Sequence, residues 1–200
     1  MNHTRMLVAA SGLWAVLWLR PLRAALEHNM ALHMAMQLPL LIGVGLLLAP
    51  ALRRHEPRWL KAADWLGIPG LVLMLFTTSF WMLPRMLDEA LADPEFDFGK
   101  FLSLPLLAGL PLGVSWRRLP PLGRAFVWAN FIPKIGAIGG LYLAAPIRLC
   151  AYYRFDQQTE AGWALIVAAI ALCFVWFVAA FAGWPARSAR TADRPAGLVV

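Results

Sequence analysis

The chain has 200 residues, of which 60% are apolar and 14% are charged, and its mean hydropathy is +0.63. Soluble domains carry about a quarter charged residues, so this composition excludes an ordinary soluble domain and indicates an integral membrane protein. The formal net charge of +7 does not indicate nucleic-acid binding, because the basic residues form short clusters beside apolar runs and no continuous stripe. We therefore expect an all-α, polytopic membrane helix bundle, with the lipid bilayer around it and no nucleic acid as a partner.

Six apolar runs divide the chain, at residues 6–19, 30–52, 64–83, 98–116, 126–146 and 161–184. A bilayer crossing needs roughly 20 apolar residues, so the sequence predicts about six membrane-spanning helices in one transmembrane domain that covers residues 1–200. The first run is short and follows a basic start, which makes a signal peptide the alternative to a retained helix. Because no small-residue cleavage site follows this run, we expect a retained helix.

The positions of Lys and Arg predict the orientation, because cytoplasmic segments retain positive charge. With the amino terminus inside, eleven of these residues fall in inner segments and six in outer segments, while Lys134 falls within the fifth run. This excess predicts that both termini are cytoplasmic. A five-helix division without the first run would keep the later orientation and move the amino terminus outside. We expect residues 185–200, which are rich in Ala, Arg, Pro and Gly, to form a mobile cytoplasmic tail.

A group of carboxylates lies between the third and fourth runs, namely Asp88, Glu89, Asp93, Glu95 and Asp97. The predicted orientation places them on the outer face, where the simplest interpretation is a solvated loop. They would also give this loop a negative surface toward a cation or a basic partner.

Few residues in the sequence support catalysis or a cofactor. Only His33 of the four histidines lies clearly within a predicted span, whereas a membrane b-type haem needs axial ligands from facing helices, so we expect no haem. The sequence contains no phosphate-binding glycine loop, zincin motif or nucleophile with its base, so we expect no enzymatic activity and no catalytic residue. Cys150 and Cys173 form no CxxC pair, and we interpret both as packing residues.

The densest polar cluster lies at the outer end of the second run. Met30, His33, Met34 and Gln37 follow the spacing i, i+3, i+4 and i+7, so they share one face of a helix. Thioether and imidazole groups suit Cu(I), and a cuprous site is one interpretation of this face. The alternative is that the methionines fill gaps between helices and that His33 hydrogen-bonds a carbonyl group.

Lys134 lies about ten residues from either end of the fifth run. A charge at that depth costs at least a few kcal/mol, which makes the residue a candidate for function. A structural role is the alternative, because Pro133 frees a carbonyl that the ammonium group can meet and Asn130 lies one turn away. The nearby glycines predict a face for close approach of another helix; they are Gly136, Gly139 and Gly140.

Polar residues also lie at the predicted start of the sixth helix. Asp156 is placed to cap this helix. Gln157 and Gln158 would face the same outer vestibule as His33 if the helices pack antiparallel.

An ordered set of short motifs runs over roughly residues 30–184. It consists of an HM pair that opens a helix, a helix that ends in Trp, Pro and Asp, a helix that closes on Trp, and a tyrosine pair followed by DQQ and Gly. The residues are His33 and Met34; Trp81, Pro84 and Asp88; Trp116; and Tyr152, Tyr153, Asp156, Gln157, Gln158 and Gly162. This set resembles the CtaG-type cytochrome c oxidase assembly factor family, small multi-helix inner-membrane proteins implicated in copper delivery to a haem-copper oxidase.

The chain departs from the family pattern in two places. Gln37 stands where the pattern has a second histidine, and the helix that ends in Trp116 lacks the further histidines. Glutamine is a poor ligand for Cu(I), so the resemblance implies either a rebuilt copper site or a lost one. The candidate ligands of a rebuilt site are His33, Met34, Met30 and Met36.

The resemblance implies a non-enzymatic assembly or accessory factor for a copper-containing oxidase of the respiratory chain in the bacterial plasma membrane. Cu(I) would be handled by ligand exchange near His33 on the periplasmic side. The alternative is a structural subunit, without the metal, that packs against a haem-copper oxidase or another membrane complex. A third interpretation is a small transporter that uses Lys134 and the outer carboxylates, and no internal repeat supports it.

Overall fold

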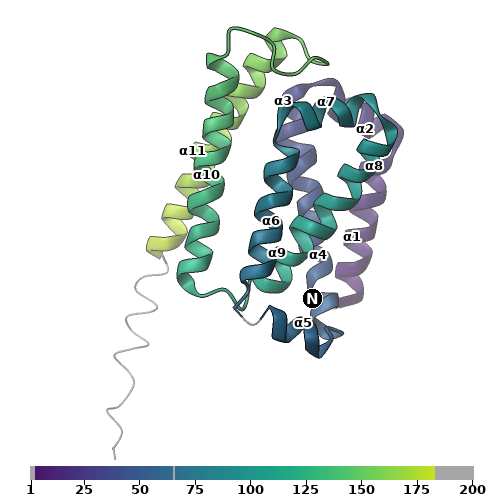
Figure 1. Ribbon diagram of the computed structural model, residues 1–200, viewed down its shortest axis with the longest axis vertical. Coiled ribbons are helices and arrows are strands. Elements are labelled where there is room, and N and C mark those ends of the chain that lie inside the picture. Colours follow the sequence, from purple (N-terminus) through teal and green to yellow (C-terminus); the bar gives the residue numbers. More distant parts are fainter. Residues whose placement is uncertain (1–2, 65, 183–200) are drawn as a thin grey trace, which may run out of the picture.

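The computed structural model describes residues 3–64 and 66–182, and Figure 1 shows it as a ribbon. All regular secondary structure within these two ranges is helical, which confirms the predicted all-α class. The predicted mobile tail at residues 185–200 lies outside the described residues.

The helices follow one another with short connections. The amino-terminal elements are α1 (His3–Trp18), α2 (Arg20–His28), α3 (Met30–Leu32), η1 (His33–Gln37), α4 (Leu38–Arg54) and α5 (Arg58–Ala63). The central elements are α6 (Ile68–Trp81), α7 (Pro84–Ala92), α8 (Pro94–Ser103), η2 (Leu104–Gly109) and α9 (Leu110–Ser115). The last two are α10 (Pro121–Ala144) and α11 (Phe155–Ala182). Because η1 and η2 are π-helical turns inside longer helices, α3 to α4 and α8 to α9 each form one continuous helix.

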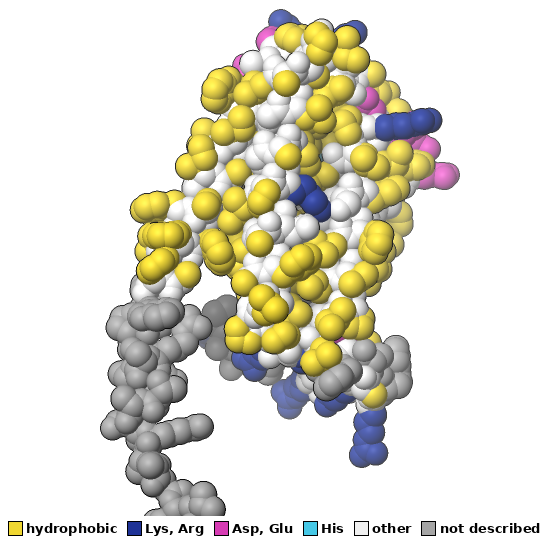
Figure 2. Space-filling view, turned by 60° about the vertical axis from the view of Figure 1, so that its left-hand side comes forward, with side chains coloured by type: hydrophobic (Ala, Val, Ile, Leu, Met, Phe, Trp, Pro, Cys, Tyr) yellow, Lys and Arg dark blue, Asp and Glu magenta, His cyan; other side chains and the backbone are white. Residues whose placement is uncertain are grey.

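Four of these helices are long and apolar enough to cross a membrane, at Met30–Arg54, Pro94–Ser115, Pro121–Ala144 and Phe155–Phe181. A fifth span is present if α6 and α7, which meet at a bend of 70°, are counted together. The first predicted run forms α1, whose apolar part Thr4–Trp18 is shorter. Figure 2 shows a mostly hydrophobic side surface with Lys and Arg gathered at the end that carries α5. The chain is therefore a membrane protein with four or five helices of spanning length among the described residues.

The third predicted span begins later than the hydropathy pattern indicates. Gly67, which has a left-handed φ of 73°, precedes α6, so this helix begins at Ile68 and not at residue 64. A Cβ atom on Gly67 would lie 2.8 Å from the carbonyl oxygen of Ser115. Both the backbone conformation and the close approach to Ser115 therefore require glycine here.

The acidic segment after α6 is not the solvated loop that the sequence predicts. Proline near the first position of α7 and of α8 is compatible with helix initiation, and the two short helices fill this segment. As a result, Asp97 lies in the first turn of α8 and is only 1% exposed.

The helix α4 lies at the centre of a bundle with α1, η2 and α9 (Figure 1). Two glycines permit close contact in this bundle. A Cβ on Gly45 would lie 2.1 Å from the carbonyl oxygen of Pro105, and a Cβ on Gly109 would lie 2.1 Å from that of Ile42. Backbone therefore packs directly on backbone between α4 and η2.

The helices α10 and α11 form an antiparallel hairpin beside this bundle (Figure 1). Gly139 packs against Gly162, with 2.8 Å between a Cβ placed on Gly139 and the Gly162 carbonyl oxygen. Gly136 makes an ordinary contact at 3.6 Å, and Gly140 faces open space. The predicted glycine face is therefore confirmed at Gly139 and is wrong at Gly140.

The hairpin packs on the bundle chiefly through α11, which contacts α3 and η1. Two apolar cavities, with volumes of about 540 and 510 Å³, lie between the hairpin and the bundle. The contacts of α11 with α3 and η1 fix one end of the hairpin. The segment that connects α10 to α11 lies at this end and reaches the polar residues described next.

Candidate functional site

A buried group of polar side chains joins α2, η1, α8 and the connection between α10 and α11. We call it the Lys100 cluster, and its members are Arg23, Glu27, His33, Gln37, Asp97, Lys100 and Tyr153. Asn29 separates α2 from α3, because its side chain accepts hydrogen bonds from the backbone N–H groups of Ala31 and Leu32. This cap turns the chain so that Glu27 and His33 reach the same interior space.

Lys100 is at the centre of the cluster and is fully buried. Its ammonium nitrogen lies 3.0 Å from Glu27 Oε1, 2.8 Å from Asp97 Oδ1 and 3.3 Å from His33 Nε2. The ammonium donates hydrogen bonds to Glu27 and His33 and forms an ion pair with Asp97. Arg23 pairs with both carboxylates from the partly exposed side. Two cations and two carboxylates therefore balance in charge.

The hydrogen bonds around His33 assign its tautomer. The Tyr153 hydroxyl donates to the backbone carbonyl of Glu27 at 3.0 Å and lies 2.7 Å from His33 Nδ1. Because the hydroxyl proton is committed to the carbonyl, Nδ1 carries the ring proton and donates it to the Tyr153 oxygen. Nε2 is then the unprotonated nitrogen, and its lone pair accepts a hydrogen bond from Lys100.

Gln37 lies on the same face as His33 at the other end of the π-helical turn. Its side-chain nitrogen donates to Glu27 Oε1 at 3.1 Å. Its side-chain oxygen is buried and has no hydrogen-bond partner among the described residues. The amide nitrogen therefore stabilises the Glu27 carboxylate, while the amide oxygen makes no hydrogen bond within the described structure.

Charge compensation also lowers the pKa of Glu27, which lies in α2 outside the long apolar helices. Burial raises the pKa of this carboxyl, but the Lys100 ammonium, hydrogen bonds from Lys100 and Gln37, and the Arg23 guanidinium together hold it below its usual value. Burial and then the Glu27 carboxylate raise the pKa of the Tyr153 hydroxyl. An ionised Glu27 and a neutral Tyr153 are the states that the hydrogen bonds require.

The structure brings together three of the four residues predicted as copper ligands. Met30 and Met34 are buried with His33, but Met36 is 49% exposed and points away from the cluster. His33 has no free lone pair, because Nδ1 carries the proton and Nε2 accepts from Lys100. A metal cation next to the Lys100 ammonium would also meet like-charge repulsion.

Two other predicted residues hold the connection between α10 and α11. Asp88 in α7 accepts hydrogen bonds from the backbone N–H groups of Ala151 and Tyr152, at 2.7 and 3.4 Å. Gln158 is buried and accepts from the Leu149 N–H at 2.8 Å. These bonds fix the segment that carries Tyr153 and so position its hydroxyl beside His33.

The remaining predicted polar residues lie outside the Lys100 cluster. Trp81 donates from its indole N–H to Ser103 Oγ at 2.7 Å, and Gln157 donates to the His28 carbonyl at 3.1 Å. Asp156 is not the cap of the last helix, because α11 begins at Phe155 and Asp156 pairs with Arg154 at the surface. His33, Gln157 and Gln158, which were predicted to face one vestibule, have different hydrogen-bond partners in the described structure, and His33 and Gln158 are buried.

Lys134 has a structural partner on another helix. Its ammonium donates to Ser79 Oγ on α6 at 2.8 Å and lies 5.6 Å from the centre of the Phe131 ring. This bond connects the hairpin to the bundle. Of the two cysteines expected to pack inside, Cys150 is buried and Cys173 is exposed.

A second ion cluster lies at the end of the bundle that carries α5. We call it the Arg118 cluster; it contains Glu56, Asp64, Ser115 and Arg118. Arg118 makes a bidentate pair with Glu56 and lies 3.0 Å from Asp64 Oδ2. Ser115 donates to the same Asp64 oxygen at 2.6 Å. This cluster ties the segments on both sides of α5 to the end of α9.

Sequence reasoning missed the part that five members play in the Lys100 cluster, namely Arg23, Glu27, Asp97, Lys100 and Tyr153. Lys100 lies just inside the start of the predicted span 98–116, and the count of Lys and Arg by segment includes it among the six outer residues. The i, i+3 spacing of Asp97 and Lys100 at the start of an apolar helix was the available signal. No local pattern connects Glu27 to Lys100, 73 residues away.

No protein-family model, no curated protein and no solved structure matches the chain. The functional interpretation therefore depends on the residues of the Lys100 cluster and on the motif resemblance.

Proposed function

We propose that the chain is a non-enzymatic accessory subunit of a larger membrane complex in the bacterial plasma membrane, in which the Lys100 ammonium has replaced a metal ion. The observation that carries this proposal is the 3.3 Å contact between Lys100 Nζ and His33 Nε2. In a metal site, a histidine ligand gives its lone pair to the metal. Here the lone pair of His33 Nε2 accepts a hydrogen bond from the Lys100 ammonium.

The pattern of departures from the CtaG-type motif supports this replacement. Lys100 lies on the helix on which the family pattern carries further histidines, and Gln37 stands in place of the second histidine after HM. Both residues contact Glu27, and Lys100 also contacts His33. A fixed ammonium carries the same single positive charge as Cu(I), so the carboxylates remain compensated without a metal.

The surface of α11 supports a packing role. Its second half exposes side chains around the whole helix; they are Phe174, Val175, Phe177, Val178 and Phe181. A helix that is hydrophobic on all sides is covered by lipid or by other helices. The motif resemblance makes a haem-copper oxidase or another respiratory complex the expected partner.

Copper titration tests the absence of a metal site. We expect that the purified chain does not remove Cu(I) from a competing chromophoric chelator. The variant Lys100→His should bind about one Cu(I), because a second imidazole then faces His33. Lys61→His, at an exposed position of α5, is the matched control and should bind none. Binding of about one Cu(I) by the unaltered chain, lost in His33→Ala, would contradict the proposal.

The composition of the partner complex separates an accessory subunit from a copper-delivery factor. In cells that lack the chain, we expect less assembled oxidase, but an unchanged ratio of copper to haem in the oxidase that remains. A delivery factor would instead leave the amount of oxidase protein similar and lower its copper content. The copper-to-haem ratio therefore decides between the two functions.

A further inference from the structure

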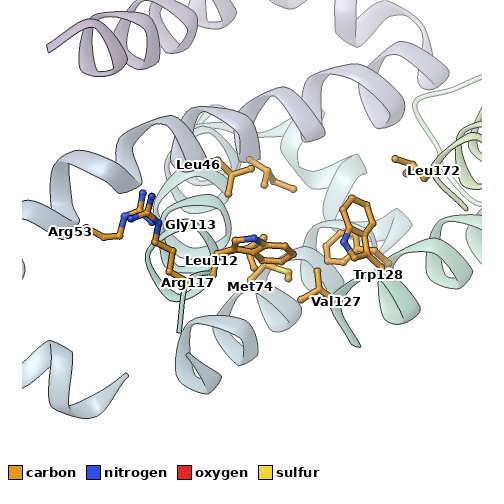
Figure 3. A pocket seen from close by; sticks show the side chains of 12 residues that line it. Leu46, Arg53, Met74, Leu112, Gly113, Arg117, Val127, Trp128 and Leu172 are labelled. Atoms are coloured by element: carbon orange, nitrogen blue, oxygen red, sulfur yellow. The ribbon is translucent and has the colours of Figure 1, made fainter. Parts of the chain in front are cut away.

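The larger cavity, with a volume of about 540 Å³, lies between the α10–α11 hairpin and the central bundle (Figure 3). Its walls are almost entirely apolar and include Leu46, Met74, Val127 and Leu172. Volumes of roughly 300–1,000 Å³ are typical of sites for small hydrophobic ligands. The second cavity shares Ile42, Phe131 and Leu172 with the first, so apolar space continues along the hairpin.

One end of this cavity carries two arginines. Arg53 comes from the last turn of α4 and Arg117 from the segment after α9, and both line the cavity. Figure 3 shows that the two guanidinium groups point toward one another. Trp116 and Trp128 line the same cavity, and tryptophan is enriched at the depth of lipid headgroups.

The two guanidinium groups have no anionic partner within the described part of the chain. Neither Arg53 nor Arg117 forms an ion pair there. The carboxylates of Glu56 and Asp64, which lie at the same end, are both paired with Arg118. Two like charges that face each other repel, and an anion between them removes this repulsion.

The geometry points to an anionic phospholipid as the ligand of this cavity, with its phosphate between Arg53 and Arg117 and an acyl chain along the apolar walls. Phosphate oxygens match the planar donor fork of guanidinium groups. The apolar walls have no partner for a free phosphate, but they match a hydrocarbon chain attached to it. This lipid site does not depend on the proposed replacement of copper by Lys100.

Lipid titration of the purified full chain by native mass spectrometry tests this site, with phosphatidylglycerol as the anionic probe and phosphatidylcholine as the zwitterionic one. The double variant Arg53→Gln/Arg117→Gln removes both phosphate contacts. The double variant Arg54→Gln/Arg58→Gln is the matched control, because it removes the same charge from two exposed positions nearby. Leu172→Trp fills the apolar part of the cavity and leaves both arginines unchanged.

We expect phosphatidylglycerol to bind more tightly than phosphatidylcholine, and the Arg53/Arg117 variant to weaken phosphatidylglycerol binding by about tenfold or more. The Arg54/Arg58 control should retain the affinity, and Leu172→Trp should weaken the binding of the phospholipid. An equal loss in the control would assign the effect to general surface charge and overturn the site. Equal affinity for both lipids, or equally tight binding of glycerol 3-phosphate without acyl chains, would also overturn it.

Discussion

The Lys100 and Arg118 clusters lie at opposite ends of the bundle, and in both a central cation pairs with two carboxylates from separate segments; in the Lys100 cluster, Arg23 also pairs with both. The cation differs between them. The Lys100 side chain is 0% exposed and its ammonium contacts Glu27, Asp97 and His33, whereas the Arg118 side chain is 21% exposed. The central cation of the first cluster is closed to solvent, and that of the second still contacts water or lipid headgroups.

This difference in exposure predicts how each cluster responds to the loss of its cation. A buried carboxylate that loses its partner has no water to replace it, and the protein bears the desolvation cost of that charge. The Glu56 and Asp64 side chains are themselves only 1% and 6% exposed, but the guanidinium group that pairs with them is 21% exposed, so water reaches both carboxylates when it is removed. The Lys100 cluster is therefore expected to contribute more to stability per ion pair than the Arg118 cluster.

The largest expected effect is that of Lys100→Met. The substitution leaves Glu27 and Asp97 without the buried ammonium, and breaking a buried pair in this way costs about 3–5 kcal/mol. We expect this loss in the free energy of unfolding, measured by circular dichroism in mixed detergent micelles. Lys61→Met, on an exposed side chain, is the control and should change stability little.

A second substitution distinguishes loss of charge balance from loss of packing. In the double variant Lys100→Met/Glu27→Gln, Asp97 is the one carboxylate left in the cluster and Arg23 balances its charge, so part of the stability should return. If the double variant is no more stable than Lys100→Met alone, the Lys100 side chain stabilises the protein through packing. Charge compensation would then not explain the difference between the two clusters.

The second expected effect is that of Arg118→Gln. Glu56 and Asp64 lose their ion pairs, but the opening toward solvent limits the loss to about 1–2 kcal/mol. The same unfolding measurement, with the exposed Arg58→Gln as control, checks this value. A loss as large as that of Lys100→Met would show that exposure does not separate the two clusters.

The helical class and the polar face of the second span could be predicted from the sequence. Hydropathy and length identify helices because the bilayer requires long apolar segments. The i, i+3, i+4, i+7 spacing placed Met30, His33, Met34 and Gln37 on one face, and all four are buried at 4% exposure or less. These features depend on residues that are close in the sequence.

The partners of this face could not be predicted from the sequence. Lys100 reaches His33 across 67 residues, and the contact depends on the relative height of two helices, which hydropathy does not determine. A charged residue near the start of an apolar run is also typical of a headgroup contact. Asp97 was assigned to a loop for the same reason, although α7 and α8 bury it.

Tyr153→Phe is expected to have a smaller effect, of about 1 kcal/mol. The hydroxyl donates to the Glu27 carbonyl and accepts from His33 Nδ1, so its removal leaves both groups with one bond fewer. The same unfolding measurement applies, and Tyr152→Phe, at an exposed neighbour, is the matched control. An equal effect at Tyr152 would indicate that the hydroxyl of Tyr153 does not fix His33.

The smallest expected effect is on the pH dependence of stability, and it belongs to Glu27. The pKa of this carboxyl is lowered in the folded protein from an ordinary value of 4.5, so the unfolded chain binds its proton first as the pH falls. The stabilisation from the ionised Glu27 is therefore complete above about pH 4.5 and is lost below it, toward the folded-state pKa. The difference in unfolding free energy between the unaltered chain and Glu27→Gln should shrink over that window. The exposed Glu95→Gln should show no such change, and a difference that stays constant with pH would mean that Glu27 is not the ionised partner of Lys100.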